Sequence, residues 1–311
     1  MPKKLSTTEI QLYHRDGYAF PVPVLTPQEV KALRQTMEVT VSAFQGPLEE
    51  LYRHKLHLSF KWADDLVHHP AIVDAVEDIL GPNILCWTSN LMVKSARDPA
   101  FVSWHQDSGY WGLEPSEVVT AWIALSPAPV EAGCMKVVPK THLGPNMPHV
   151  DTFNKNNLLS RGQELTIEIK DDQGVAMPLL AGEMSLHHIK LVHGSGQNNS
   201  DDKRIGFAIR YMSDRVRKNG QRESAMLVRG ENANDFFSLE KRPRQDFDID
   251  GQLNHNRAVR RQIGNNYAPQ GEANWAQKFR LSRKKLLSQA GLDFLYWKLK
   301  LQKLTSHERF Y

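Results

Sequence analysis

The chain has 311 residues, of which 41% are hydrophobic and 24% are charged, as is ordinary for a globular protein with a sizeable core. Its 39 lysine and arginine residues nearly balance its 35 aspartate and glutamate residues, so the net charge of +4 is too small to indicate a nucleic-acid partner. Cys86 and Cys134 cannot build a disulfide framework, and we find neither a signal-peptide pattern nor an apolar run long enough for a membrane helix, so we expect one large cytoplasmic domain.

The first part of the chain predicts helices around an edge strand. Residues 8–15 form a helical pattern that ends at Gly17, and a proline with a capping-box glutamate opens a second helix over residues 26–44. A third helix is predicted over residues 70–80. Between the first two helices, residues 18–24 alternate in polarity and carry prolines, which suits an edge strand.

From residue 83 to about residue 212 the pattern changes to short runs rich in β-branched and aromatic residues, separated by Gly, Pro and Asn. The clearest predicted strands are residues 84–88, 118–125 and 205–211. Strands at this spacing predict a mainly β fold with flanking helices, built on a sandwich or barrel. Residues 146–163 are polar and rich in asparagine, and we predict a long surface loop there.

The strand pattern ends near Arg215. Residues 216–311 are predicted to be a C-terminal extension, first a loop and then basic amphipathic helices over about 272–304. Such helices either pack their apolar face on the barrel or dock on a membrane surface or a partner. A homodimer formed across a two-fold axis is one such arrangement.

The residues that carry chemistry lie in the β region. His105 and Asp107 are two positions apart, and such residues on a strand point to the same face, so both can reach one ion. His193 lies at the end of a later predicted strand. Two histidines and one carboxylate form the facial triad that holds iron(II) and leaves positions open for a cosubstrate and oxygen. A His-x-Asp pair taken alone is also found as a structural pair.

An arginine after His193 supports the metal interpretation. Arg204 follows the turn over residues 195–203, so the antiparallel return brings its guanidinium toward the metal end, where it can bind a carboxylate through two bonds. Arg210 shares the face of Arg204 on the same predicted strand. It indicates an anionic group on a substrate, unless it pairs with a buried acid such as Glu183 or caps the barrel.

Neighbouring aromatic residues and histidines leave alternatives open. Tyr110 and Trp111 follow the ligand pair and could form the wall of a substrate pocket or pack in the core. His187 and His188 could be mistaken for the distal ligand. Strand parity puts His187 on the side of His193, and we predict a structural or supporting role for both.

Three segments in this order resemble the phytanoyl-CoA dioxygenase family of iron(II)- and 2-oxoglutarate-dependent oxygenases. They are His105-Gln106-Asp107, residues 182–188, and residues 193–200 followed by Arg204 and Arg210-Tyr211. The resemblance extends over residues 12–211. It implies a double-stranded β-helix (jelly-roll) core in a catalytic domain over residues 1–215, with the C-terminal extension packed on it or continuing it.

The resemblance also implies the cofactors and the residues that hold them. Iron(II) would be bound by His105, Asp107 and His193, and the C5 carboxylate of 2-oxoglutarate by Arg204. Ser195, Trp122 and Asn90 would be further cosubstrate contacts. The implied activity is hydroxylation by O2 with release of succinate and carbon dioxide.

Several outcomes remain open from the sequence. Asp107 is present where the family's halogenases carry a small residue, so hydroxylation is preferred to halogenation. Desaturation, demethylation or ring formation would use the same site, and a non-catalytic cupin-like metal- or ligand-binding protein is the remaining rival. No basic patch marks a CoA site, so we expect a small polar or anionic metabolite as the substrate.

Overall fold

Two β-sheets form the centre of the structure, a computed structural model that describes residues 2–43 and 54–266. The seven-stranded main sheet has the order β1-β10-β5-β12-β2-β14-β15, and the four-stranded second sheet has the order β3-β11-β6-β9. The main sheet consists of β1 (Tyr18–Pro23), β2 (Ile84–Lys94), β5 (Val118–Ala124), β10 (Glu183–His188), β12 (Arg204–Ser213), β14 (Ser224–Arg229) and β15 (Ser238–Leu239). The second sheet consists of β3 (Val102–His105), β6 (Met135–Val138), β9 (Val175–Met177) and β11 (Val192–Ser195).

The remaining strands form two short ladders, β4 with β13 and β7 with β8. Their bounds are β4 (Leu113–Glu114), β7 (His149–Asp151), β8 (Gln163–Leu165) and β13 (Arg217–Lys218). The α-helices are α1 (Thr7–Asp16), α2 (Pro27–Ala43), α4 (Lys61–Val67), α5 (Pro70–Leu80), α6 (Ser108–Trp111) and α7 (Ile249–Asn266), and the short 3-10 helices are η1 (Leu56–Leu58), η2 (Val130–Ala132), η3 (Thr141–Leu143) and η4 (Asp171–Gln173). Within residues 2–43 and 54–266, none of the helices combines the length and apolarity needed to cross a bilayer.

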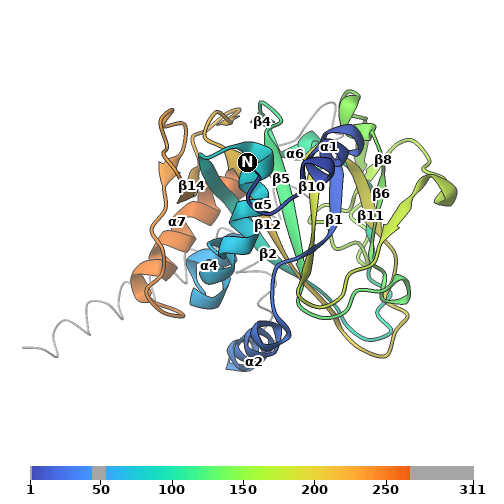
Figure 1. Ribbon diagram of the computed structural model, residues 1–311, viewed down its shortest axis with the longest axis horizontal. Coiled ribbons are helices and arrows are strands. Elements are labelled where there is room, and N and C mark those ends of the chain that lie inside the picture. Colours follow the sequence, from blue (N-terminus) through green and yellow to red (C-terminus); the bar gives the residue numbers. More distant parts are fainter. Residues whose placement is uncertain (1, 44–53, 267–311) are drawn as a thin grey trace, which may run out of the picture.

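The two faces of the main sheet differ in what covers them. In Figure 1, α4, α5 and α7 gather on one side of the sheet, and β6, β8 and β11 lie on the other. Along β12, alternate residues such as Ile205, Phe207 and Ile209 join the same apolar cluster as Ile72 and Val73 of α5. Because side chains alternate along a strand, the residues between them point toward the second sheet. That inner face carries the functional site.

The fold class predicted from the sequence, mainly β with flanking helices around a jelly-roll core, is confirmed. The helices α1, α2 and α5 occupy the predicted segments, and β1 lies at an edge of the main sheet as its prolines indicated. Local signals explain these elements. Ser6 and Glu9 form a capping box at the start of α1, and Gly17 ends that helix with a φ of 90° that favours glycine.

Two segments differ from the sequence prediction. The predicted surface loop over residues 146–163 contains β7 and reaches β8, and its Arg161 is buried, with 2% exposed. The Arg161 guanidinium lies 4.7 Å from the centre of the Tyr110 ring, so aromatic packing holds a segment whose composition reads as a loop. After Arg215, where the sequence predicts a loop, β14 pairs with β2 and extends the main sheet. The predicted basic C-terminal helices lie outside the described residues, and the domain division at residue 215 stays a prediction.

A buried ionic cluster ties the C-terminal part of the main sheet to the rest of the fold. Lys55 Nζ lies 2.7 Å from Glu240 Oε1 and donates to the carbonyl oxygens of Trp87 and Ser224 at 2.5 and 2.8 Å. His57 Nε2 lies 3.3 Å from the other carboxylate oxygen. Burial raises the pKa of Glu240, but the charge of Lys55 and the hydrogen bond with His57 outweigh it and hold the pKa at about 2.

Replacing Glu240 with glutamine should therefore lower the free energy of unfolding by about 3–5 kcal/mol at pH 7, because the Lys55 ammonium is left buried without a counter-ion. Since the folded pKa of Glu240 is depressed, its stabilisation is present above the unfolded carboxyl pKa and is lost as pH falls toward 2. The difference between wild type and Glu240→Gln in urea denaturation should shrink over that range. Glu117→Gln, which breaks a surface pair with Arg215, is the control and should cost less than about 1 kcal/mol. Equal losses in the two variants would contradict the prediction.

Candidate active site

The three predicted metal ligands meet at one end of the second sheet. His105 ends β3 and His193 lies in β11, directly opposite each other in the antiparallel ladder, with ring centroids 4.1 Å apart. Asp107 lies at the start of α6, and its Oδ1 is 3.4 Å from His105 Nε2. All three residues are buried, and one ligand atom from each lies within 4.8 Å of the others. Because β3 ends at His105, Asp107 reaches the cluster through the turn into α6 and not by the strand alternation that the sequence suggested.

The hydrogen bonds of the two imidazoles leave suitable atoms for a metal. His105 Nδ1 lies 2.9 Å from the Ser103 carbonyl oxygen, and His193 Nδ1 lies 2.9 Å from that of Leu191. Because a carbonyl oxygen can only accept, both Nδ1 atoms carry the hydrogen and both Nε2 atoms keep a lone pair. Asp107 Oδ2 is buried without a hydrogen-bond partner in the described part of the chain. These donors fit one divalent ion of the facial-triad type.

The protonation of the cluster near pH 7 also suits a metal. Burial and the proximity of His105 lower the pKa of His193 to about 4. Burial raises the pKa of Asp107, but the proximity of His105 and of His193 outweighs it and keeps the pKa below its ordinary value. A neutral imidazole and an ionised carboxylate are the forms that bind a divalent cation. Neither His193 nor Asp107 therefore has to lose a proton first.

A buried arginine lies on the inner face of the main sheet beside the cluster. Arg204 begins β12, is 2% exposed, and donates from Nη1 to the Gly133 carbonyl at 2.5 Å. Its Cζ lies 5.2 Å from the centre of the Trp122 ring. Gly206 makes room for that ring, since a Cβ there would lie 1.9 Å from the indole. Arg204 Nε is buried and has no partner among the described residues, so this edge of the guanidinium can receive a carboxylate.

Two cavities meet at the metal-ligand cluster. The Arg204 chamber is lined among others by Trp122, His187, His193, Ser195 and Arg204. The Arg210 chamber is lined among others by Trp87, Asn90, Tyr110, Trp111, Gln163 and Gln262. His105, Asp107 and Arg210 line both cavities. Two reactants could therefore approach one ion from separate directions.

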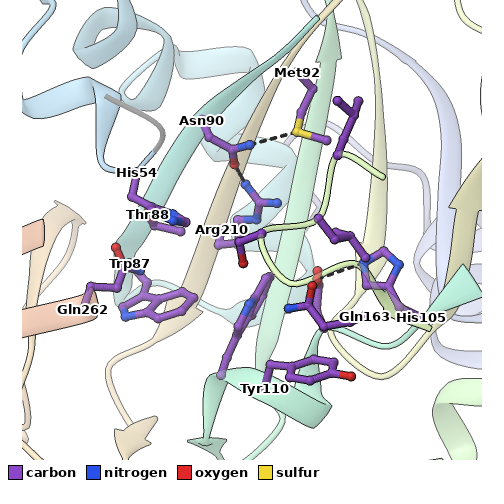
Figure 2. A pocket seen from close by; sticks show the side chains of 15 residues that line it. His54, Trp87, Thr88, Asn90, Met92, His105, Tyr110, Gln163, Arg210 and Gln262 are labelled. Atoms are coloured by element: carbon purple, nitrogen blue, oxygen red, sulfur yellow. Dashed lines mark hydrogen bonds and ion pairs between the residues drawn. The ribbon is translucent and has the colours of Figure 1, made fainter. Parts of the chain in front are cut away.

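The Arg210 chamber combines one cation with aromatic walls. Figure 2 shows the Arg210 guanidinium beside Asn90, with Tyr110 and Gln163 across the cavity. Arg210 Nη1 donates to Asn90 Oδ1, and its Cζ lies 5.4 Å from the centre of the Trp111 ring. The guanidinium is thus held from two sides, by an amide and by an aromatic face.

The aromatic wall is held from behind by residues that follow β12. The rings of Trp87 and Trp111 lie 5.1 Å apart, and Trp87 Nε1 donates to the fully buried Glu223 at 2.7 Å. Lys218 Nζ donates to the Trp111 carbonyl oxygen at 2.7 Å. Together with Gln262 of α7, these contacts make the C-terminal part of the described chain a component of this chamber.

Comparison with known families decides the assignment. The family model described as "Phytanoyl-CoA dioxygenase (PhyH)" matches residues 13–206, a range that contains His105, Asp107, His193 and Arg204. The chain belongs to the phytanoyl-CoA dioxygenase family. The resemblance seen in the sequence is thereby confirmed. The matched range ends before Arg210.

Relatives within the phytanoyl-CoA dioxygenase family differ in substrate. A Stutzerimonas stutzeri protein named "Probable alpha-ketoglutarate-dependent hypophosphite dioxygenase" is 30% identical over 158 residues, which cover 50% of this chain and 54% of that protein. The L-proline trans-4-hydroxylase of Streptomyces griseoviridis is 31% identical over 228 residues, 64% of this chain and 83% of that protein. The chain spans about half the length of most curated relatives it matches, including the human peroxisomal phytanoyl-CoA dioxygenase at 57%.

Solved structures of similar proteins share the fold. The apo structure of a non-heme monooxygenase, ThoJ, is 33% identical with a TM-score of 0.73 and covers 88% of this chain and 98% of its own. CytC3 with Fe(II) and alpha-ketoglutarate, at 20% identity and a TM-score of 0.59, covers 80% and 97% and supports the fold alone. Iron and 2-oxoglutarate, the predicted cofactors, are those of the phytanoyl-CoA dioxygenase family.

The structure divides the other predicted site residues between the two chambers. Ser195 and Trp122 line the Arg204 chamber, whereas Asn90, predicted as a cosubstrate contact, lines the Arg210 chamber and bonds with Arg210. Arg210, Tyr110 and Trp111, predicted as substrate residues, line the Arg210 chamber. His187 lies beside the metal-ligand cluster, and its ring is 4.6 Å from that of His193. Burial lowers the pKa of His187. The functional roles of these residues stay predictions.

Lys94 is a functional candidate that the sequence analysis missed. It ends β2 opposite Arg204 and is fully buried, and its Nζ donates to Ser195 Oγ at 2.7 Å and to the Gly196 carbonyl. Burial and the charge of Arg204 lower the pKa of Lys94 to about 7. The available sequence signal was that Lys94 directly follows the apolar residues Leu91 to Val93.

The affinity for 2-oxoglutarate should therefore depend on pH through Lys94. The Lys94 side chain is mostly protonated below pH 7 and mostly neutral above it. Because a bound dianion favours the protonated form, the affinity for 2-oxoglutarate should weaken as pH rises from 6 to about 9. A rise of one pKa unit on binding corresponds to about tenfold in affinity. Anaerobic titrations at a series of pH values test this, with Lys94→Met expected to bind weakly throughout and without the trend. The exposed Lys31→Met is the control, and a wild-type profile in Lys94→Met would contradict the prediction.

Proposed function

We propose that the protein is an iron(II)- and 2-oxoglutarate-dependent dioxygenase that hydroxylates an unactivated C–H bond of a small polar or anionic metabolite. The cosubstrates would be 2-oxoglutarate and O2, and the by-products succinate and carbon dioxide. The observation that carries the proposal is the meeting of two chambers at the His105, Asp107 and His193 cluster, one of them closed by a buried arginine.

The residues of the Arg204 chamber would hold the cosubstrate. The unpaired Nε edge of Arg204 would bind the C5 carboxylate, with Ser195 Oγ, itself fixed by Lys94, as a neighbouring hydrogen-bond partner. Trp122 would keep the guanidinium in place through its ring face. The two histidines and Asp107 would hold iron(II), which when bound couples oxidative decarboxylation of the oxo acid to oxygen insertion into a C–H bond.

The Arg210 chamber would take the substrate. Tyr110 and Trp111 give it apolar walls that position a substrate and limit water near the metal cluster. Asp107 would take the third ligand position, where a halogenase would need an open site for chloride, which favours hydroxylation. The two cysteines are free and buried, which supports a reducing compartment such as the cytoplasm.

Anaerobic titration of the iron(II)-loaded protein with 2-oxoglutarate tests the proposal directly. A 2-oxo acid that chelates ferrous iron gives a weak visible charge-transfer band, which we expect to saturate with 2-oxoglutarate and to be absent with succinate as the control ligand. Admission of O2 should then release succinate. A folded, iron-replete protein that gives no band would rule out the oxygenase and favour the non-catalytic binding protein.

A further inference from the structure

Arg210 is a cation in the wall of the Arg210 chamber that no carboxylate of the described chain neutralises by direct contact. It extends from β12, and its Nη1 donates to Asn90 Oδ1 and, at 3.4 Å, faces the Ala208 carbonyl oxygen. The Trp111 ring covers one face of the guanidinium. Glu183, the acid considered from the sequence, accepts instead from the Leu180 backbone N–H. Arg210 is half-buried, and a partly desolvated cation without a counter-ion points to a ligand that supplies the negative charge.

The contacts of Arg210 leave one edge of the guanidinium open. Both hydrogen bonds to protein atoms use Nη1, and Nε is buried without a partner among the described residues. The Nε and Nη2 hydrogens lie side by side in the guanidinium plane and match the two oxygens of a carboxylate. Asn90 accepts from Arg210 and so orients the guanidinium without neutralising it.

The rest of the chamber suits an uncharged body. Trp87, Trp111 and Tyr110 supply aromatic surface, and the polar groups there include Gln163. Among the described lining residues, Asp107 is the single carboxylate, and it belongs to the metal-ligand cluster. Among the described residues of this wall, an ammonium group on the substrate would therefore find no ion-pair partner outside the metal-ligand cluster.

We infer that the substrate is a small monocarboxylic acid with an uncharged body, whose carboxylate is bound through two hydrogen bonds by Nε and Nη2 of Arg210. This inference rests on the proposed function and gives that function its substrate class. The body of the acid lies against the Trp87 and Trp111 walls. Asn90 is the positioning residue for the guanidinium.

The test is a panel of small monocarboxylic acids, each paired with its primary amide and its α-amino derivative. Succinate release above the uncoupled background is measured with the iron(II)- and 2-oxoglutarate-loaded full-length protein. We expect stimulation by acids and none by the matching amides, with the α-amino derivatives weaker than the acids. Stimulation confined to amides, to α-amino derivatives or to the matching sulfonates, or none by any acid, would overturn the inference.

Two variants separate the role of Arg210 from a general effect on the fold. Arg210→Met should weaken the apparent affinity for the best acid at least about thirtyfold, and Asn90→Asp should do the same by placing a carboxylate on the guanidinium. Arg210→Met should keep the 2-oxoglutarate charge-transfer band, and the exposed Arg217→Met is the matched control. A band lost in Arg210→Met would assign Arg210 to the cosubstrate and overturn this inference alone, whereas a band absent from wild type would remove the proposed function.

Discussion

Asp107→Ala should abolish iron(II) binding and reduce 2-oxoglutarate-dependent succinate release at least about 1,000-fold, equivalent to ~4 kcal/mol of transition-state stabilisation. The carboxylate is the single anionic donor of the cluster. Its Oδ2 has no hydrogen-bond partner in the described chain and is available to bind an ion. Binding is measured by anaerobic competition with a chromophoric iron chelator and turnover by succinate release.

The same variant should remain folded without metal. Removing Asp107 takes away a buried carboxylate whose ion-pair contact in the described chain, with His105 Nε2, is 3.4 Å long. The urea midpoint of the metal-free protein measures the change in stability separately from iron binding. Asp201→Ala, which removes a surface carboxylate paired with Arg97, is the matched control and should keep wild-type binding and turnover. Iron binding and succinate release retained by Asp107→Ala would exclude this residue as a ligand.

Arg204→Met should weaken 2-oxoglutarate binding by about 30- to 5,000-fold while leaving iron(II) binding intact. The guanidinium is buried beside Trp122 with its Nε edge unpaired, and losing one partner of a buried charged pair costs about 2–5 kcal/mol of binding free energy. Methionine preserves much of the side-chain volume, so the change mainly removes the charge and the donors. The concentration of 2-oxoglutarate that half-saturates the charge-transfer band measures the effect.

Arg204→Lys sharpens the interpretation, because a lysine keeps the charge but cannot make the two parallel bonds of a guanidinium. We expect it to fall between wild type and Arg204→Met. Arg215→Met removes an exposed arginine paired with Glu117 and should titrate as wild type does. If Arg204→Met saturates at the wild-type concentration, the C5 carboxylate is bound elsewhere.

The inner face of β12 was predictable because side chains alternate along any strand. Arg204 and Arg210 share a face in the sequence pattern, and the structure places both at the chambers while Ile205 and Phe207 pack toward the helices. For His105 and His193, the sequence predicted only that their residue types suit one metal. Their direct opposition in the ladder depends on the register of β3 with β11, which no local pattern fixes.

Long-range contacts account for what the sequence could not predict. Lys94 belongs to the site because β2 pairs with β12, and Trp87 belongs to a chamber wall because Glu223 accepts its indole N–H. Neither contact leaves a signal near the residue in the chain. Asn90 is a different case. The family resemblance predicts that it contacts the cosubstrate, whereas in the structure its side chain lies beside Arg210.

The boundary of the family match has a consequence for how this protein could change over evolutionary time. The metal-ligand residues and Arg204 lie within residues 13–206, whereas Arg210, Glu223 and Gln262, which shape or support the other chamber, lie beyond it. A lineage could therefore change the substrate contacts of the later segment while inheriting its oxygen chemistry unchanged. Because Trp87, Asn90 and Trp111 of the same chamber lie within the matched range, grafting residues 207–262 between relatives would move only part of the substrate choice.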